Sequence, residues 1–526
     1  MPVRSLVKAH LYKDSVSLMR IAEALSGMPG VRYATLLMGT GANKQLLEQA
    51  RHLTAEVQDA NPDDLMIVLE ADAEAALDAG VDRAERLLAE GGEERGTAEG
   101  RERPPQSLGG ALSRFPGATL AQISTPGPYA AAEALKALRR GLHVFLFSDN
   151  VPLEQEIFLK GVAQHKGLLV MGPDCGTALI GGIPLGFANV VRRGAIGLVA
   201  ASGTGLQQVT CLIHRFGDGV SHGIGTGSHD LSEAVGGVTF GQALDLLQGD
   251  GQTRVIVLIS KPPAPSVAGR ILERIRGSVK PVVVLFLGGA PGPVQAAGAI
   301  PVSTLAEAAS TAVTLARGAS PRTERDAIVG QAENAAAEGR VLLASQRYVR
   351  GLFSGGTFCS EAQVVWGQMG LVAHSNVPLE KAYLLPDLRH SREHTAIDMG
   401  SDEFTVGRPH PMIDFRYRNE RMLREAADPT TAVILLDIVL GYGAHSDPAA
   451  VLAPVLREAR GTAEREGRHL AVVGSVCGTE EDPQRLSVQE ARLRDAGMLL
   501  APSNAAAAWL AAAIATRSAA LKESSQ

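Results

Sequence analysis

The stretch Ala195-Ile-Gly-Leu-Val-Ala-Ala-Ser-Gly-Thr-Gly205 decides the fold, because it runs from an apolar strand through a glycine turn into a helical pattern that starts at Leu206. A second stretch, Val433-Ile-Leu-Leu-Asp-Ile-Val-Leu-Gly-Tyr-Gly443, leads in the same way into Ala444-His-Ser-Asp-Pro448. A strand that ends in small residues at a helix N-terminus directs unpaired backbone N–H groups and a partial positive charge at one place. Each stretch therefore predicts an anion site, and phosphate is the usual occupant of such a site.

Both glycine turns supply candidate phosphate contacts. These are Ser202, Gly203, Thr204 and Gly205 in the first turn, and Gly441, Gly443, Ala444 and His445 in the second. Simpler explanations exist for each set. Serine and threonine are common helix N-caps, glycines can permit close packing of a strand on a helix, and His445 can be a surface histidine. Two such turns in one chain favour chemistry on a phosphorylated group held between facing helix ends.

Composition limits the class of protein. At 526 residues the chain is long enough for about three or four domains. Glycine makes up 58 of these residues, about 11% against a usual 7%, and its position after strands favours nucleotide-type α/β turns. The net charge of −6, without a dense basic cluster, argues against nucleic-acid binding.

Apolar runs and cysteine spacing indicate the cellular compartment. No apolar run approaches the length of a membrane helix, and the first residues lack the apolar core of a signal peptide. The four cysteines are far apart in sequence and form no Cys-x-x-Cys pair, which is typical of a reducing compartment and gives no zinc framework. We therefore expect a cytoplasmic protein that binds neither membranes nor nucleic acid, and we infer no metal.

Alternating strand and helix patterns divide the chain into blocks. Residues 1–90 predict a small α/β domain of the ferredoxin-like type, and the charged, proline-bearing residues 91–108 predict a flexible linker. Residues 109–190 and 191–318 each predict a parallel sheet with helices between the strands. An Ala- and Glu-rich helical connector over 319–345 then leads to the last block.

The last block, 346–520, repeats the same strand and helix pattern, and a polar tail of residues 522–526 predicts disorder. The fold class that follows is α/β and multidomain.

Three loops of the second block should lie on one edge of its sheet, because ligands of parallel sheets sit at the carboxyl ends of the strands. The candidate ligand-binding residues in these loops are Ser124, Pro126, Pro128, Asp149, Asn150, Gly172, Pro173, Asp174 and Cys175. A nucleophilic role for Cys175 would need a depressed pKa. No sequence feature indicates one, so packing is the favoured role of this thiol.

Candidate catalytic groups follow the glycine loop Gly223-Ile-Gly-Thr-Gly227. His229 and Asp230 could act there as acid and base, and His445 is a third candidate. The alternative for Asp230 is that it caps a helix that begins at Leu231.

Two further clusters of polar residues have simple explanations. His390 and His394 have the spacing of a metal pair on a helix, but their charged surroundings favour a solvated loop. Arg416, Arg418 and Arg421 could face an acidic substrate, although a solvated helix face is the favoured interpretation.

Several of these motifs resemble succinyl-CoA synthetase. Pro126-Gly-Pro128, Asp149-Asn-Val-Pro152 and Gly172-Pro-Asp-Cys175 look like the CoA-binding half of its α subunit, and Gly197–Thr204 resembles the phosphate-holding helix start of that subunit. Gly223–Gly227 resembles the glycine loop that follows it.

The last block is similar to the C-terminal domain of the β subunit. Asp398-Met-Gly400 and Gly441–Asp447 match its phosphate-holding helix start, and Arg350–Gly356 matches the segment that leads in. The order of these parts resembles the FdrA family of acyl-CoA synthetases, over roughly residues 110–515. The resemblance implies a Rossmann-like CoA-binding domain, two flavodoxin-like domains, and CoA as the cofactor at the three loops.

Two parts of such a synthetase are absent from this sequence. The region that should carry the phosphate-shuttling histidine, Gly288–Ile300, contains no histidine, and no stretch is left for an ATP-grasp domain. The remaining core, which would hold an acyl group and a phosphate, could catalyse the half-reaction between an acyl phosphate and an acceptor. FdrA-like proteins have been proposed as one subunit of an oxamate carbamoyltransferase of allantoin catabolism, which implies carbamoyl phosphate and an acid or amide acceptor as substrates.

Three functions therefore stay open. The first is transfer of a carbamoyl or acyl group from its phosphate, with partner subunits. The second is an acyl-CoA ligase whose ATP-grasp portion is a separate chain, and the third is a non-catalytic regulator that binds CoA or an anion. A fused α–β pair of this kind is also expected to form a homo-oligomer.

Overall fold

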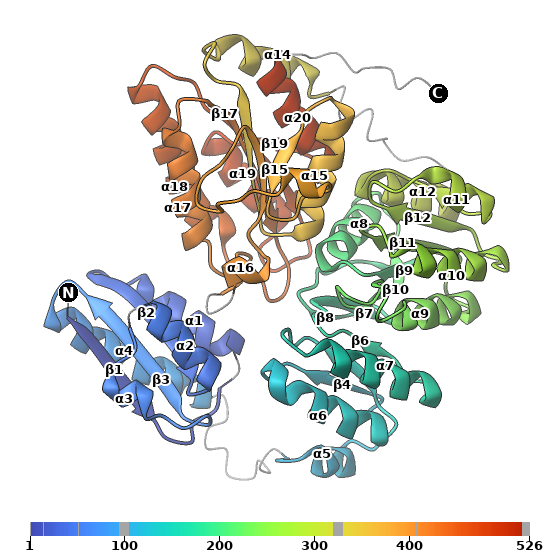
Figure 1. Ribbon diagram of the computed structural model, residues 1–526, viewed down its shortest axis with the longest axis horizontal. Coiled ribbons are helices and arrows are strands. Elements are labelled where there is room, and N and C mark those ends of the chain that lie inside the picture. The colour runs from blue at the N-terminus through green and yellow to red at the C-terminus, as the bar shows by residue number, and fades with distance from the viewer. Residues whose placement is uncertain are drawn as a thin grey trace. The chain divides into compact units, whose positions relative to one another are not determined.

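The computed structural model describes residues 2–13, 15–50, 52–93, 105–318, 330–405 and 409–517 (Figure 1). They form two compact units, one of residues 1–117 together with 402–414, and one of residues 118–401 together with 415–526. Most of the predicted linker, the first part of the predicted connector and the predicted tail lie outside the described residues. None of the described helices has the length and hydropathy needed to cross a membrane.

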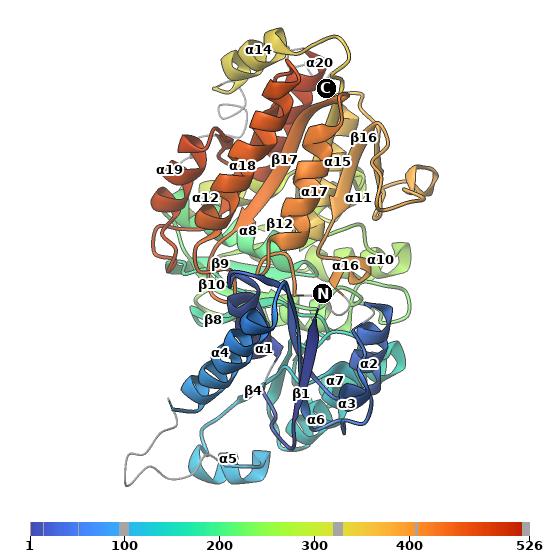
Figure 2. The same cartoon turned by 90° about the vertical axis from the view of Figure 1, so that its left-hand side faces the viewer.

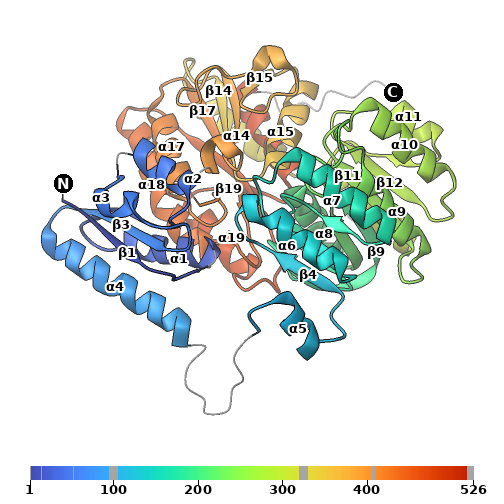
Figure 3. The ribbon, with the colours of Figure 1, turned by 60° about the horizontal axis from the view of Figure 1, so that its bottom comes forward.

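The first unit is built on an antiparallel sheet of order β1-β3-β2. Alternate residues of β3 face two sides: Ile67 and Leu69 pack in the cluster under α1 and α4, and Met66 and Val68 pack with residues of α2 and α3. Figure 3 shows α1 and α4 beside this sheet. The elements are β1 (Val3–Lys8), α1 (Ser15–Ser26), β2 (Val31–Met38), α2 (Gly41–Gln49), α3 (Ala55–Gln58), β3 (Leu65–Ala71), α4 (Glu74–Glu93) and α5 (Leu108–Arg114).

The second unit begins with a parallel sheet of order β4-β5-β6. Helices α6 and α7 connect its strands and pack against each other. Strands and helices alternate in this block, as the sequence predicts. They are β4 (Leu120–Ile123), α6 (Gly127–Arg139), β5 (His143–Leu146), α7 (Leu153–Lys166) and β6 (Val170–Met171).

The next sheet has the order β13-β12-β11-β9-β10-β7-β8. Its strands are parallel except for the hairpin β7–β8, which pairs antiparallel with β10. The loop predicted at Gly223 is partly a strand, because β10 continues to Gly225. The elements are β7 (Thr177–Ile180), β8 (Ile183–Gly186), β9 (Arg193–Ala200), α8 (Gly203–Arg215), β10 (Val220–Gly225), α9 (Val238–Gly249), β11 (Val255–Ser260), α10 (Pro265–Arg276), β12 (Val282–Phe286), α11 (Pro291–Ala296), β13 (Ile300–Pro301) and α12 (Leu305–Arg317).

The last sheet is parallel, with the order β15-β16-β14-β17-β18-β19. Helices α15 and α20 pack together, and α17 and α18 lie side by side (Figure 2). The elements are α14 (Ala332–Val341), β14 (Tyr348–Phe353), α15 (Gly356–Gln368), β15 (Ala373–Ser375), β16 (His394–Asp398), α17 (Arg416–Ala427), β17 (Thr431–Val439), α18 (Pro448–Arg465), β18 (Ala471–Cys477), α19 (Leu486–Asp495), β19 (Leu499–Ala501) and α20 (Asn504–Thr516). The short helix α16 (Asp402–Thr405) belongs to the first unit.

Parallel sheets with helices on both faces confirm the α/β multidomain prediction. In the last sheet Gly351 of β14 approaches the ring of Trp366 on α15, whereas the adjacent Arg350 pairs with Glu425 on α17. In a strand, successive side chains point to opposite faces. The two helix pairs therefore cover opposite faces, and all carboxyl ends of the strands lie at one edge.

Candidate functional site

The N-termini of α8 and α15 meet. Ser202 is the N-cap of α8, and its hydroxyl accepts the N–H of Gly205 at 2.9 Å. The same hydroxyl lies 2.5 Å from Oγ1 of Thr357, in the first turn of α15. A Cβ added to Gly355, the N-cap of α15, would lie 2.7 Å from Cγ2 of Thr204. Only a residue without a side chain fits between the two helix starts.

Free backbone donors remain at this junction. Among the described residues, the backbone N–H groups of Gly203 and Thr204 on α8, and of Gly356 and Thr357 on α15, have no hydrogen-bond acceptor. Unpaired N–H groups at a helix start carry partial positive charge and suit an anion. Two such starts therefore direct their donors at one junction.

The start of α15 is the part of this site that the sequence interpretation did not assign as a phosphate contact. A signal for it exists, because Phe353-Ser-Gly-Gly-Thr357 repeats the pattern of Ala201-Ser-Gly-Thr-Gly205: an apolar strand, a serine, then glycines and a threonine. The segment Arg350–Gly356 had been assigned only as leading into the second glycine turn.

A buried charge pair holds the start of α15. Asp437 of β17 accepts the backbone N–H of Ser354 at 2.7 Å and also its hydroxyl. The guanidinium of Arg418 donates to the carboxylate and to the backbone carbonyl of Asp437. Both side chains are about 1% exposed, and burial raises the pKa of Asp437.

The prediction of a solvated face for Arg416, Arg418 and Arg421 is wrong for two of the three. Arg418 and Arg421 are buried, because carboxylates of β17 and α17 neutralise them: Asp437 pairs with Arg418, and Glu425 pairs with Arg421 at 2.5 Å. These partners are remote in sequence or hidden among the many charges of α17, so the sequence does not reveal the pairing.

The second glycine turn packs against the hairpin region of the preceding sheet. The N–H of Tyr442 donates to the carbonyl of Ala188 at 2.8 Å. A Cβ on Gly441 would lie 2.5 Å from that carbonyl oxygen, and one on Gly443 would lie 2.7 Å from the ring of Phe187. Both glycines have positive φ, 103° and 80°. Close packing and conformation thus account for these glycines, as the simpler alternative proposed.

Helix α18 has less capacity for an anion than α8 or α15. Its N-cap is Asp447, whose carboxylate accepts the N–H of Ala450, and its first residue is Pro448, which has no N–H. The N–H of Ala449 donates to Gln489. Gly443 and Ala444, just before this helix, still have backbone N–H groups without an acceptor among the described residues.

His445 is half-buried in this turn. Its ring stacks edge to face on Phe415, with 5.6 Å between the ring centroids. Its Nδ1 lies 3.0 Å from the N–H of Asp447 and accepts that hydrogen bond. The neutral ring therefore carries its proton on Nε2, so it presents a donor.

One short segment contacts both glycine turns. Thr177 donates its hydroxyl to the carbonyl of Phe187 at 2.6 Å. A Cβ on Gly203 would lie 3.5 Å from Oγ1 of Thr177, and Gly443 packs on the ring of Phe187. The turns at Gly203 and Gly443 are therefore neighbours, with Thr177 and Phe187 between them.

The three loops of the β4-β5-β6 sheet also gather. A Cβ on Gly127 would lie 2.4 Å from the carbonyl oxygens of Asp149 and Asn150, and the N–H of Asp174 donates to the carbonyl of Ser148 at 2.9 Å. Ser124, Pro128, Asp149, Asn150 and Asp174 are exposed there, Pro126 is half-buried, and Gly172, Pro173 and Cys175 are buried. Asn150 and Asp174 have positive φ, uncommon for residues other than glycine.

The thiol of Cys175 is not a nucleophile in this environment. It is 2% exposed, and burial raises its pKa to about 12. A thiol with that pKa is protonated at neutral pH, in agreement with the packing role that the sequence favoured.

His229 and Asp230 do not form a pair with each other. Asp230 is fully buried, accepts the N–H groups of Thr239 and Phe240, and pairs with Lys160 at 2.7 Å. It serves the start of α9 at Val238; the helix expected at Leu231 is absent. His229, which is exposed, lies 3.5 Å from Glu156, and this contact raises the pKa of His229.

His390 and His394 lie on different kinds of structure. His390 is exposed in a loop and pairs with Asp387 at 2.7 Å. His394 starts β16, and burial lowers its pKa to about 4. They are not on one helix face, so the spacing that suggested a metal pair does not apply.

Two family models match parts of the chain. Residues 352–514 match the CoA-ligase model, and residues 1–104 match a model described as "AllF, heavy metal-associated domain". A heavy-metal site in residues 1–104 would need side chains that suit such a metal. Residues 1–104 contain no cysteine, the ligand that soft heavy metals prefer.

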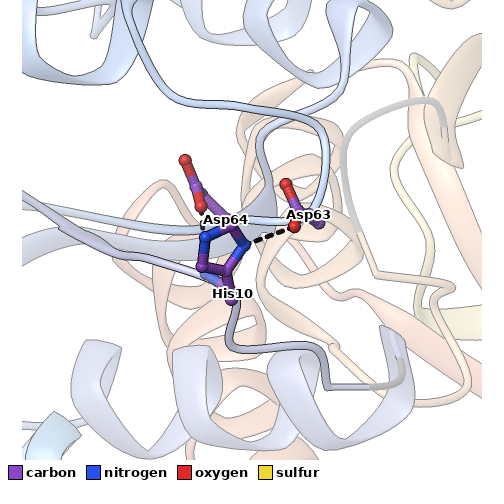
Figure 4. Close-up of side chains that lie close together, drawn as sticks. All are labelled: His10, Asp63 and Asp64. Atoms are coloured by element: carbon purple, nitrogen blue, oxygen red, sulfur yellow. Dashed lines mark hydrogen bonds and ion pairs between the residues drawn. The ribbon is translucent and has the colours of Figure 1, made fainter.

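The candidate ligand cluster in the described part of this domain is His10, Asp63 and Asp64 (Figure 4). Asp64 accepts the backbone N–H groups of His10 and Asn61 at 3.0 and 2.7 Å, so its two oxygens already stabilise a turn. His10 forms an exposed ion pair with Asp63. These residues do not fit a soft metal ion, and we derive no chemistry from one.

Similar proteins cover either nearly the whole chain or about a third of it. YahF of Escherichia coli K12 is 43% identical over 510 residues, which are 96% of this chain and 97% of YahF. The sulfoacetate-CoA ligase subunit SauD of Bilophila wadsworthia is 27% identical over 34% of this chain and 61% of its own length. Succinate–CoA ligase subunit alpha 2 of Archaeoglobus fulgidus is 29% identical over 32% and 58%. The chain thus belongs to the family of YahF, and it combines an AllF-type domain over residues 1–104 with a CoA-ligase domain over residues 352–514.

Proposed function

We propose that this chain is an FdrA-type subunit that transfers a carbamoyl group between carbamoyl phosphate and oxamate in allantoin catabolism. The junction of α8 and α15 carries the proposal, because two sets of free N–H donors at one place suit the phosphoryl group of an acyl phosphate. The AllF-type N-terminal domain supports the same pathway.

The transfer needs few groups from the protein. The acceptor nitrogen attacks the carbonyl carbon and a C–N bond forms. The C–O bond to phosphate breaks, and the departing inorganic phosphate takes up the proton that the nitrogen loses. The N–H groups of Gly203, Thr204, Gly356 and Thr357 hold the phosphoryl oxygens and stabilise the charge that develops on them. Gly443 and Ala444 supply further donors, which suit the carboxylate of the acceptor. Fixed positions of both substrates provide much of the remaining rate.

The histidines take different parts in this proposal. His445, whose ring packs on Phe415 and whose Nδ1 accepts the N–H of Asp447, lies beside the second turn and is the candidate residue there for contact with the acceptor. His229, whose pKa is raised by Glu156, lies on the edge with Asp174 and serves as the candidate acid there. Buried Asp230 acts as a positioning residue for α9 and Lys160. Ser124, Asp149, Asn150 and Asp174 stay the candidate contacts for CoA.

A second function has its own support. The CoA-ligase model and the similarity to ligase subunits favour an acyl-CoA ligase that works with a separate ATP-grasp subunit. The absence of a histidine between Gly288 and Ile300 disfavours it, since no residue there could carry the phosphoryl group.

One pair of mixtures separates these functions. The full chain, with and without the proteins encoded beside it, is incubated with carbamoyl phosphate and oxamate, and separately with ATP, CoA and succinate. Phosphate release in the first mixture alone supports transfer. ADP and thioester formed in the second would establish the ligase instead, and no reaction in either would leave a binding protein.

A pair of variants ties the activity to the helix starts. Gly203 has space for a side chain, so Gly203→Asp places a carboxylate in the first turn of α8, where it suits the helix but repels an anion. Gly203→Asn is its neutral match. We expect at least a tenfold loss of carbamoyl phosphate turnover in Gly203→Asp relative to Gly203→Asn. Equal activities would place the anion elsewhere.

A further inference from the structure

Lys261 follows β11 at the edge where α8 begins. The N–H of Ala201 donates to the carbonyl of Ile259 at 3.1 Å. A Cβ on Gly205, in the first turn of α8, would lie 3.1 Å from Cγ2 of Ile259. Ile259 therefore faces α8, and Lys261, two residues further on, is the first residue after the end of β11.

The charge of Lys261 also reaches α15. Cys359 is buried in the first turn of α15, and burial raises the pKa of its thiol. The negative charge of Asp398 raises that pKa further, and the positive charge of Lys261 lowers it. Asp398 itself lies against Gly356 at the start of α15. One cation and one anion therefore flank the junction of α8 and α15.

The ammonium group of Lys261 is available. The side chain is exposed, and it forms neither a hydrogen bond nor an ion pair with any residue that the structure describes. By contrast, the ammonium groups of Lys160 and Lys280 are bonded to protein oxygens. Pro262 and Pro263 follow directly, and a residue before proline is confined to extended conformations. The backbone that carries the ammonium is thus restricted before any ligand binds.

We propose that Lys261 is a binding residue for the phosphoryl group, whose charge it neutralises together with the N–H groups of α8 and α15. This inference rests on the proposed function of the junction and adds to it a cationic residue that binds the phosphoryl group. Asp398 brings a negative charge to the same place, so backbone dipoles alone would hold a dianion weakly. A cation beside them favours a phosphoryl dianion over a neutral acyl group.

The experiment measures binding directly, without turnover. Inorganic phosphate and carbamoyl phosphate are titrated into the full chain by calorimetry at low ionic strength, with line broadening in phosphorus NMR as a second readout. The variants are Lys261→Met, Lys261→Arg and Gly203→Asp. Lys166→Met is the matched control, because Lys166 is an exposed lysine at the end of α7 and its loss changes the net charge equally.

We expect Lys261→Met to weaken phosphate binding at least tenfold, Lys261→Arg to stay within about threefold of the parent chain, and Lys166→Met to bind as the parent does. Binding by Lys261→Met as tight as that of the parent, while Gly203→Asp loses phosphate, would overturn the role of Lys261 and leave the proposed function standing. If the parent binds no phosphate, or Gly203→Asp binds it equally well, the proposed phosphate site fails and this inference fails with it.

Discussion

Glu361 on α15 offers a sharp test of the interface between the two larger sheets. Its side chain is 1% exposed, and its carboxylate accepts the N–H of Leu305 at 2.7 Å and the side-chain amide of Asn504 at 2.8 Å. Leu305 is the first residue of α12 and Asn504 the first of α20. Burial raises the pKa of Glu361 to about 7, although both hydrogen bonds oppose that rise.

The free energy that Glu361 contributes follows from the shift of its pKa. A rise from the ordinary value of 4.5 to about 7 corresponds to about 3 kcal/mol at about 1.4 kcal/mol per pH unit. Because the folded pKa is the higher one, the contribution of Glu361 to stability is complete below about pH 4.5 and is lost as the pH rises to 7. Glu361→Gln cannot ionise. Between pH 5 and pH 8, its free energy of unfolding should therefore rise by about 2–3 kcal/mol relative to the parent chain.

Tryptophan fluorescence reports on unfolding near Glu361. The chain has two, Trp366 on α15 and Trp509 on α20, and the indole N–H of Trp366 donates to the carbonyl of Ala508. Urea unfolding followed by their fluorescence reports on the helices that Glu361 joins. Glu420→Gln, an exposed carboxylate on α17, is the control and should keep a constant difference from the parent at every pH. Parallel curves for Glu361→Gln would refute the assignment of a buried, ionising carboxyl group.

Three further substitutions or modifications test the packing of the site. Gly441→Ala should cost about 1–3 kcal/mol of stability, because φ of Gly441 is 103° and the new Cβ would lie 2.5 Å from the carbonyl oxygen of Ala188. An unchanged melting temperature in a thermal melt would contradict this prediction. Arg418→Met should cost about 3–5 kcal/mol in urea unfolding, because it leaves the buried carboxylate of Asp437 unpaired. The double variant Arg418→Met/Asp437→Leu should recover much of that loss. A double variant as unstable as the single one would contradict the charge-pair argument. The thiol of Cys175 should resist iodoacetamide at pH 8 in the folded chain and react with it in urea, and mass spectrometry of the labelled peptide measures this difference. Rapid labelling of the folded chain would contradict a thiol pKa near 12.

The sequence indicates strands and turns better than it indicates which side chains pair with each other. Apolar runs that end in a glycine turn predicted β9 and β17 to within a few residues, because burial and a turn at the end leave a local signal. In the last block the sequence identified the strand at Val433 but not β14, β15 and β16. Arg350 interrupts the apolar pattern of β14, and its charge is tolerated in the sheet because Glu425 and Asp428 neutralise it.

Pairing between remote residues leaves no such local signal. Lys160 on α7 pairs with Asp230, and the thiol of Cys211 on α8 adjoins that of Cys477 at the end of β18. Each pair joins segments that the sequence treats as separate blocks. The energies involved depend on burial, which periodicity can suggest for apolar residues but not for charged ones.

The same reasoning explains why the sequence interpretation did not assign the start of α15 as a neighbour of the first glycine turn. The two glycine turns chosen from sequence look alike, and both follow buried strands, yet α18 is capped by its own carboxylate at Asp447, whereas α15 has only Gly355 at its cap. A helix start that lacks a side-chain cap keeps its donors for another group. The absence of a capping side chain after Ser354, rather than the number of glycines, is therefore the feature that distinguishes the start of α15 from that of α18. This feature can be found in the sequence once the preceding strand is located.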